Sequence, residues 1–376
     1  MAKCSQNRDS IPDPAQRPRM GILTGGGDCP GLNAVIRAAV KTALNTGWEI
    51  FGIREGFAGL LAPGTAVCPL GPEDVKGILN MGGTILGTTN RGNPFAFPVR
   101  QGRDWVEQDR SDEAVANFKK LGLDALIVIG GDGTLGIARR FFQKGMPVIG
   151  VPKTIDNDIA ATVITFGFDT AVSTATDAID KLHSTAESHQ RVMVVEVMGR
   201  YAGWIALNSG VAGGADVILI PEIPFRLKHV VAKIQARYAA GRRFAIVVAA
   251  EGAAAQGEAL RTRGKKIGQE VRLGGIGEHL AGEIERCTGY ESRSLVLGHL
   301  QRGGQPTTFD RLLATRFGSA AVRLAREGFF GQMVALDPPH IKSVPLEEAL
   351  DRMNRVPLTS DVVRAARDMG ISFGDA

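Results

Sequence analysis

Short apolar runs alternate with helix-length amphipathic stretches along most of the chain. The runs at 125–129, 148–151 and 192–197 are rich in Val, Ile and Leu, and each ends in glycine or polar residues. Such runs are typical of buried parallel strands, whereas the stretches at 33–44 and 170–187 have the length and pattern of helices. Because strands that alternate with helices form βαβ units, the pattern predicts an α/β fold with mostly parallel sheets flanked by helices.

The length of the chain and this alternation predict two lobes. A chain of 376 residues can form two ordinary domains. We expect a first lobe at 20–160, a second lobe at 161–325, and a C-terminal helical segment at 326–376 that returns to the first lobe. The polar, proline-containing stretch 1–19 is predicted to be a disordered arm. Right-handed crossovers would align the strand ends, so residues far apart in the sequence can meet in one cleft.

Composition narrows the class of protein and of partner. Hydrophobic residues make up 44% of the chain and charged residues 22%, as in ordinary soluble globular proteins. The net charge is only +5, and the one dense basic stretch, at 261–266, has no interleaved aromatic residues, so we expect no nucleic-acid partner. No run reaches the roughly 18 apolar residues of a membrane span. The four cysteines form no Cys-x-x-Cys pair, which favours a cytoplasmic protein.

Two glycine-rich turns follow predicted strands and are suited to phosphate binding. The first, Gly-Gly-Gly-Asp at 25–28, lets backbone N–H groups approach a phosphate, although a tight turn without a ligand explains it equally well. The second, Gly-Gly-Asp-Gly-Thr at 130–134, adds an acid that can hold Mg²⁺ beside the phosphate. This motif occurs in several kinds of kinase, including NAD kinases and lipid kinases, so it indicates a nucleotide phosphate without identifying the acceptor.

The polar segment at 152–158 is the most informative of the chain. It directly follows a predicted parallel strand, and open α/β sheets bind their ligands at such carboxyl ends. Alternation along an extended strand end would put Thr154, Asp156 and Asp158 on one side, with Asn157 on the other. A carboxylate there can orient a sugar hydroxyl for phosphoryl transfer. The alternative is an Asp-rich turn that caps the next helix.

Basic residues gather at the starts and ends of other predicted strands. Arginine forks bind phosphate monoesters through two parallel hydrogen bonds. A surface ion pair is the default role for a single arginine, but several at predicted strand ends favour an anion site. These positions, with a histidine and a glutamate at further strand ends, are Arg191, Arg200, Arg293, Arg302, His299 and Glu251.

With these motifs the chain resembles the 6-phosphofructokinases from about residue 20 to about residue 335. The similarity comprises motifs in matching order and spacing at 24–33, 130–134, 152–158, 188–191, 196–200, 212–214 and 298–304. It implies an active site between two α/β lobes, with 20–160 binding the phosphoryl donor and 161–325 binding the sugar phosphate. The implied glycolytic reaction transfers the γ-phosphoryl group of ATP to the 1-hydroxyl of fructose 6-phosphate, with Mg²⁺.

The resemblance also implies roles for individual residues. Asp156 would be the base, and Thr154 and Arg200 would assist the transfer. The donor phosphates and Mg²⁺ would be bound by Gly27, Arg91, Gly131, Asp132, Gly133 and Thr134, with Asp132 as metal ligand and Asp158 in its outer shell. The sugar phosphate would be bound by Thr154, Asp156, Arg191, Met198, Gly199, Arg200, Glu251, Arg293, His299 and Arg302. In the family, residues matching Arg191 and Arg293 reach over from a neighbouring subunit, which implies a homotetramer or homodimer with shared sites.

Two positions bear on the identity of the phosphoryl donor. ATP-dependent members of the family usually have glycine at both, and pyrophosphate-dependent members have aspartate and lysine; this chain has Gly133 and Lys153. A carboxylate at 133 would crowd and repel an α-phosphate, so Gly133 favours ATP, with pyrophosphate as the alternative donor. A non-catalytic sugar-phosphate or nucleotide sensor is a remote alternative, against which Asp156 argues. An NAD-kinase-like enzyme would not explain Glu251 or the strand end at 299–302.

Overall fold

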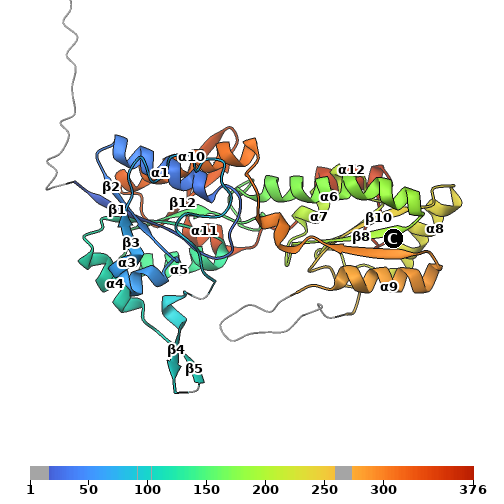
Figure 1. Ribbon diagram of the computed structural model, residues 1–376, viewed down its shortest axis with the longest axis horizontal. Helices are drawn as coiled ribbons and strands as arrows, with labels where there is room; N and C mark the ends of the chain where they lie inside the picture. Colours follow the sequence, from blue (N-terminus) through green and yellow to red (C-terminus); the bar gives the residue numbers. More distant parts are fainter. Residues whose placement is uncertain (1–16, 91, 103, 259–272) are drawn as a thin grey trace, which may run out of the picture.

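The computed structural model describes residues 17–90, 92–102, 104–258 and 273–376, which form two lobes side by side (Figure 1). Each lobe is built on a sheet of mostly parallel strands with helices on both faces, so the predicted α/β fold class is confirmed. Most of the predicted disordered arm, at 1–16, lies outside the described residues, as does Arg91.

The first lobe contains a seven-stranded sheet in the order β13-β12-β7-β6-β1-β2-β3. Its central strands β1, β6 and β7 are parallel, and nearly all of their residues are buried because helices cover both faces. Antiparallel strands close the two edges. The strand bounds are Arg19–Thr24 (β1), Glu49–Ile53 (β2), Val67–Pro69 (β3), Ala125–Gly130 (β6), Val148–Pro152 (β7), Gln332–Asp337 (β12) and His340–Pro345 (β13).

Helices α1 and α10 pack on each other and cover one face of this sheet, while α2, α4, α5 and α11 cover the other (Figure 1). Helix α4 has acidic residues in its first turn and lysines in its last, which complements the helix dipole. A small hairpin, β4–β5, projects from this lobe. The bounds are Leu32–Asn45 (α1), Ala58–Leu61 (α2), Pro63–Ala66 (α3), Pro94–Ala96 (η2), Phe97–Gln101 (β4), Asp104–Gln108 (β5), Ser111–Lys120 (α4), Asp132–Gln143 (α5), Thr308–Arg326 (α10) and Leu346–Asp351 (α11).

The second lobe contains a four-stranded parallel sheet in the order β11-β8-β10-β9. Helices α6, α7 and α12 pack on one face, and α8 and α9 pack on the other (Figure 1). The bounds are Phe168–His189 (α6), Val192–Val197 (β8), Trp204–Ala212 (α7), Val217–Leu219 (β9), Leu227–Ala239 (α8), Ala245–Ala250 (β10), Ile276–Thr288 (α9), Ser292–Val296 (β11), Gly298–Arg302 (η3) and Asp361–Asp368 (α12).

The C-terminal part of the chain differs from the helical segment predicted at 326–376. Residues 332–345 form the hairpin β12–β13, which pairs with β7 of the first sheet. The apolar run of β12 is short and buried on both faces, so its sequence shows neither a helical nor a strand period. The sequence pattern therefore does not distinguish a helix from a strand here. Helix α12 packs on α7 of the second lobe, and Ser372 bridges to Val217. Helix α10, predicted within the second lobe, packs on the first.

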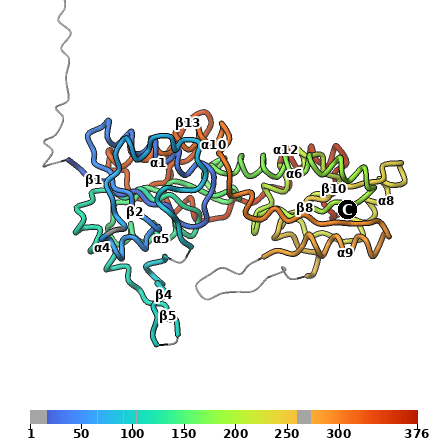
Figure 2. The backbone as a smooth tube through the Cα atoms, viewed as in Figure 1, coloured from blue at the N-terminus to red at the C-terminus, as the bar shows by residue number. Residues whose placement is uncertain are grey.

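The fold brings the polar strand ends of both lobes together. The chain passes between the lobes after β7, after β11 and after α11 (Figure 2). The carboxyl ends of β1, β6 and β7 meet at one edge of the first sheet, and those of β8, β10 and β11 meet at one edge of the second. A hydrogen bond of 3.2 Å from Arg302 Nη1 to the carbonyl of Asp28 joins the two edges.

Candidate active site between the two lobes

The first glycine-rich turn, at 25–28, is held closely against neighbouring segments. The amide of Gly25 donates to the carbonyl of Ile129 at 2.9 Å, and Thr88 Oγ1 donates to the carbonyl of Gly26 at 2.6 Å. A Cβ atom on Gly25 would lie 2.6 Å from the side chain of Thr134. Only glycine therefore lets the backbone of this turn pack so closely against Thr134.

The second turn leads directly into α5, whose N-cap is Gly131. Asp132 and Gly133 form the exposed first turn of this helix, where free N–H groups and the helix dipole favour an anion. A Cβ atom added to Gly133 would meet nothing within 4 Å. The structure therefore leaves open space at this position, and Thr134 is buried behind it.

The acceptor loop, residues 153–158, is braced from behind by Asn157 and Thr165. Asn157 Oδ1 accepts from the amide of Thr165 at 2.9 Å, and Thr165 Oγ1 donates to the carbonyl of Thr154 at 2.8 Å. The amide of Asp156 donates to Thr154 Oγ1 at 3.1 Å. Asp156 Oδ1 is buried and has no hydrogen-bond partner within the described structure, so this oxygen is available to a ligand.

The acidic groups of the cleft affect one another. Burial raises the pKa of Asp156, and Arg302 and Arg200 partly oppose this shift. Burial also raises the pKa of Asp158 to about 7, with further contributions from the charges of Asp156 and Asp132. Burial and the charge of Asp156 raise the pKa of Glu251 to about 7. Carboxylates from both lobes thus share one partly desolvated space with two arginines.

The residues predicted to bind the sugar phosphate follow strands of the second lobe. Gly199 has φ of 134°, a conformation that favours glycine, and leads into Arg200. The amide of Met198 donates to Gln301 Oε1 at 3.3 Å, which joins this loop to η3. Glu251 follows β10, and its backbone N–H donates to the carbonyl of Val197 at 2.8 Å.

Two residues of η3 complete this side of the cleft. His299 is exposed on the short helix. Arg302 reaches the first lobe, where a Cβ atom on Gly27 would lie 2.9 Å from its guanidinium. Arg302, one of the residues predicted to bind the sugar phosphate, therefore lies next to the first glycine-rich turn of the first lobe.

Two predicted sugar-phosphate residues are not brought to this cleft. Arg191 and Arg293 lie at the amino ends of β8 and β11, the opposite ends from the cleft, and both form ion pairs with Glu291 at 2.8 and 2.5 Å. The amino ends and the carboxyl ends of parallel strands lie at opposite edges of a sheet. These two arginines therefore do not serve the cleft of their own chain.

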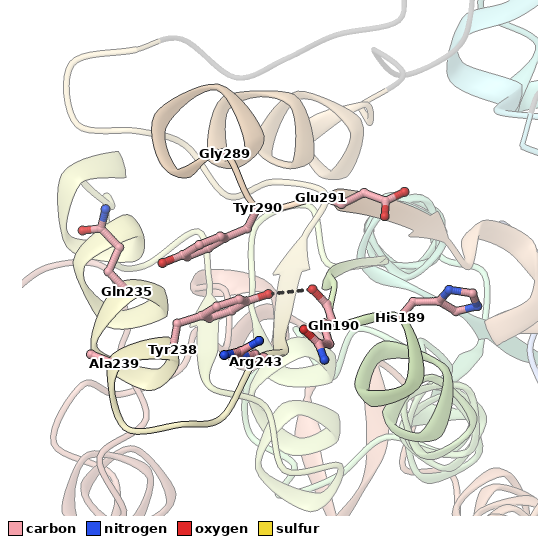
Figure 3. A pocket seen from close by; sticks show the side chains of 9 residues that line it. All are labelled: His189, Gln190, Gln235, Tyr238, Ala239, Arg243, Gly289, Tyr290 and Glu291. Carbon is pink, nitrogen blue, oxygen red and sulfur yellow. Dashed lines mark hydrogen bonds between the residues drawn. The ribbon is translucent and has the colours of Figure 1, made fainter.

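A hollow of about 620 Å³ lies beside these arginines, away from the cleft (Figure 3). The rings of Tyr238 and Tyr290 stack there with centroids 3.8 Å apart, and the Tyr238 hydroxyl donates to the carbonyl of Gln190 at 3.1 Å. None of the predicted catalytic residues lines it.

The carboxylates of the cleft fit a magnesium ion that is held partly by substrate. No cluster of three or more His, Cys, Asp or Glu side chains arranged to hold a metal occurs in the described part of the chain. Mg²⁺ commonly uses only one or two carboxylates and takes its other ligands from phosphates and water. Asp132 is exposed and its charge acts on Asp156 and Asp158, so a divalent cation would offset their mutual repulsion.

Several contacts that shape the site were not predicted from the sequence, although Lys153 itself was expected to bear on the donor. Lys153 Nζ donates to the carbonyl of Gly27, Gln301 joins the two sugar-side loops, and Asn354 contacts the acceptor loop. Each acts on residues more than 100 positions away, and nothing in a local pattern indicates such contacts.

Among the described helices, none combines the length and the apolar character needed to cross a membrane.

Comparison with known proteins identifies similar chains. The family model described as Phosphofructokinase matches residues 19–325. The chain is 55% identical to the ATP-dependent 6-phosphofructokinase of Chloroflexus aggregans, over 96% of this chain and 99% of that protein. It is 54% identical to the pyrophosphate–fructose 6-phosphate 1-phosphotransferase of Amycolatopsis mediterranei, over 90% of this chain and 96% of that protein. The structure of phosphofructokinase from Saccharomyces cerevisiae matches with a TM-score of 0.77 at 30% identity, over 95% of this chain and 48% of that one.

Proposed function

The chain belongs to the phosphofructokinase family, and we propose that it transfers the γ-phosphoryl group of ATP to the 1-hydroxyl of fructose 6-phosphate. The observation that carries this proposal is the buried, unpartnered carboxylate oxygen of Asp156 at the end of β7. The charge of Asp132 acts on this carboxylate from the donor side, and the charges of Arg200 and Arg302 act on it from the sugar side. A hydroxyl bound there would face a donor held at the start of α5.

On the donor side, the backbone N–H groups of the two glycine-rich turns bind the phosphates. Gly27, Gly131, Gly133 and Thr134 form this cradle, and the dipole of α5 favours the negative charge. Asp132 is the residue that would hold Mg²⁺. When bound, this ion would supply positive charge that offsets the negative charge developing on the phosphoryl group during transfer.

On the acceptor side, Asp156 orients the 1-hydroxyl and takes its proton. The hydroxyl oxygen bonds to the γ-phosphorus, the bond between the γ-phosphorus and the bridging oxygen of ADP breaks, and the proton passes to the Asp156 carboxylate. A loose transition state needs little proton transfer before the new bond forms, so orientation is much of the task. Thr154 and Arg200 stabilise the transferred group, and Asp158 would help to hold the metal from its outer shell.

The sugar phosphate is bound by the second lobe. Arg302 and His299 face the 6-phosphate, and Arg200 stands between it and the transferred group. Glu251 accepts hydrogen bonds from sugar hydroxyls, and the glycine backbone at 199 lets the sugar approach the loop that begins with Met198.

The assignment of ATP as donor rests on the space at Gly133. Since a Cβ atom there would meet nothing within 4 Å, the path for an α-phosphate is open. Relatives named as ATP-dependent reach 55% identity over 96% of this chain and those named for pyrophosphate reach 54% over 90%, so the comparisons also favour ATP. Pyrophosphate is the alternative, and Lys153 is the residue that favours it.

Arg191 and Arg293 serve a neighbouring subunit in this proposal. Both lie at the end of the second lobe that is remote from the cleft of their own chain, where they can face the sugar phosphate of another copy. This placement implies a homotetramer or a homodimer with shared sites. The location that we propose for the enzyme is the cytoplasm.

The test is formation of fructose 1,6-bisphosphate from fructose 6-phosphate and Mg²⁺, with ATP or pyrophosphate as the sole donor. We expect turnover with ATP. Turnover with pyrophosphate alone would overturn the donor assignment and leave the acceptor chemistry standing. No product with either donor would overturn the proposed function as a whole.

A further inference from the structure

The short segment between α11 and α12 contacts both walls of the cleft. Residues 352–360 carry the chain from the first lobe to the second, because α11 packs on α5 and α12 packs on α7. Within this segment Asn354 is partly buried and makes hydrogen bonds to both lobes. The resemblance to phosphofructokinases gave it no role.

Asn354 holds the acceptor loop through two bonds. Its side-chain Nδ2 donates to the carbonyl of Asn157 at 2.8 Å, and its backbone N–H donates to the carbonyl of Asp158 at 2.8 Å. The preceding residue, Met353, pairs with Ile159 in an isolated antiparallel bridge. Both bonded carbonyls directly follow Asp156 in the chain, so a shift at Asn354 would move the backbone that carries this carboxylate.

The same residue holds the second lobe. Trp204 Nε1 donates to the carbonyl of Asn354 at 2.8 Å, and Trp204 begins α7 four residues after Arg200. Two residues further on, the amide of Val356 donates to Glu222 Oε1 at 2.9 Å, and this carboxylate also accepts from the amide of Gly203 at 3.0 Å. Both contacts therefore lie next to the loop that carries Arg200.

We infer that Asn354 is a positioning residue, which sets the acceptor loop with Asp156 in register with the Arg200 loop. The inference rests on the proposed function, since it assumes that these two loops act on one reacting group. Effective catalysis depends on sub-ångström alignment of such groups, and a displacement of about 1 Å can cost about a hundredfold in rate. One residue bonded to both loops would limit that displacement.

Two variants of Asn354 separate positioning from packing. Asn354→Asp keeps the shape of the side chain but replaces the Nδ2 donor by an oxygen that repels the Asn157 carbonyl, and Asn354→Ala removes the donor. We expect kcat with ATP to fall about tenfold in both, with KM for fructose 6-phosphate within about twofold of the native value. The exposed neighbour Arg355 provides the control Arg355→Ala, which should match the native enzyme.

The second half of the link is tested by Trp204→Phe, which removes the indole donor and keeps an aromatic ring. It should also lower kcat, and the double variant with Asn354→Ala should lose less than the product of the two single losses, because both break one connection. These variants overturn the inference if kcat stays native while only the melting temperature falls, or if Asn354→Asp behaves as the native enzyme. Failure of the native chain to form product would instead overturn the proposed function.

Discussion

The Nζ atom of Lys153 donates a hydrogen bond to the carbonyl oxygen of Gly27. This lysine, which follows β7, therefore supports the first glycine-rich turn, at 25–28. Lys153 is only 3% exposed, and burial lowers the pKa of its ammonium group. The nearby carboxylate of Asp28 partly opposes this shift, and burial also raises the pKa of the neighbouring Cys29 thiol to about 12. Under the proposed function, Lys153 would therefore act on the donor through the backbone of this turn as well as through its charge.

Replacement of Lys153 tests whether the lysine selects the donor or supports the turn. Lys153→Met keeps much of the volume but loses the hydrogen bond to Gly27. Since bonds from charged groups contribute about 1.5–3 kcal/mol, we expect kcat/KM for ATP to fall at least about tenfold, with pyrophosphate use affected to a similar extent. Lys144→Met, at a surface ion pair of the same lobe, is the control. Loss confined to pyrophosphate would show direct donor selection instead.

Gly133 should decide whether a nucleotide fits. We expect Gly133→Asp to reduce kcat/KM for ATP far more than for pyrophosphate, because the new carboxylate would crowd and repel an α-phosphate that pyrophosphate lacks. The open space at this position allows the side chain without strain in the fold. Gly136 lies on the same helix and also has no atom within 4 Å of an added Cβ, so Gly136→Asp is a matched control. Equal loss with both donors would refute the steric argument.

The sequence predicted those parts of the site that follow strands directly. The turns at 25–28 and 130–134 and the loop at 152–158 are local signals, in which polar or glycine residues interrupt an apolar run. Parallel pairing then brings these ends to a common edge, as the crossover rules require. Fold class and the acceptor loop could therefore be predicted without a structure.

Contacts between distant segments could not be predicted in this way. Lys153 meets Gly27 across 126 positions and Asn354 meets Asn157 across 197 positions, and neither pair shares a local period. The β12–β13 hairpin was missed because a short run buried on both faces is compatible with helix or strand. Arg91 lies outside the described residues, so its predicted role at the donor phosphates stays a prediction.

Asp156 should be essential for the chemical step. Asp156→Asn keeps the size of the side chain but removes the carboxylate that takes the hydroxyl proton, so we expect kcat to fall by orders of magnitude. Binding of fructose 6-phosphate, measured by calorimetry, should stay near normal because the second lobe supplies most of its contacts. Asp112→Asn, at an exposed ion pair, is the control. A kcat close to the native value would exclude Asp156 as the base.

Asp310 should make the stability of the fold depend on pH. Its carboxylate is fully buried at the start of α10, where Oδ2 accepts from the amide and the hydroxyl of Thr170 in α6 at 2.8 and 2.6 Å. Its other oxygen has no partner within the described structure, and burial raises the pKa of the carboxyl group to about 6. The folded protein therefore binds this proton more tightly than the unfolded chain, whose ordinary Asp pKa is about 3.8.

The stabilising contribution of the Asp310 proton is thus complete below about pH 4 and is lost as the pH rises through about 6. The native protein should lose up to roughly 3 kcal/mol relative to Asp310→Asn between these limits, since each pKa unit corresponds to about 1.4 kcal/mol. Urea unfolding of both proteins at several pH values between about 4 and 7 measures the difference. Asp177→Asn, at an exposed ion pair, should follow the native curve. Parallel curves for the native protein and Asp310→Asn would show that Asp310 does not titrate in this range.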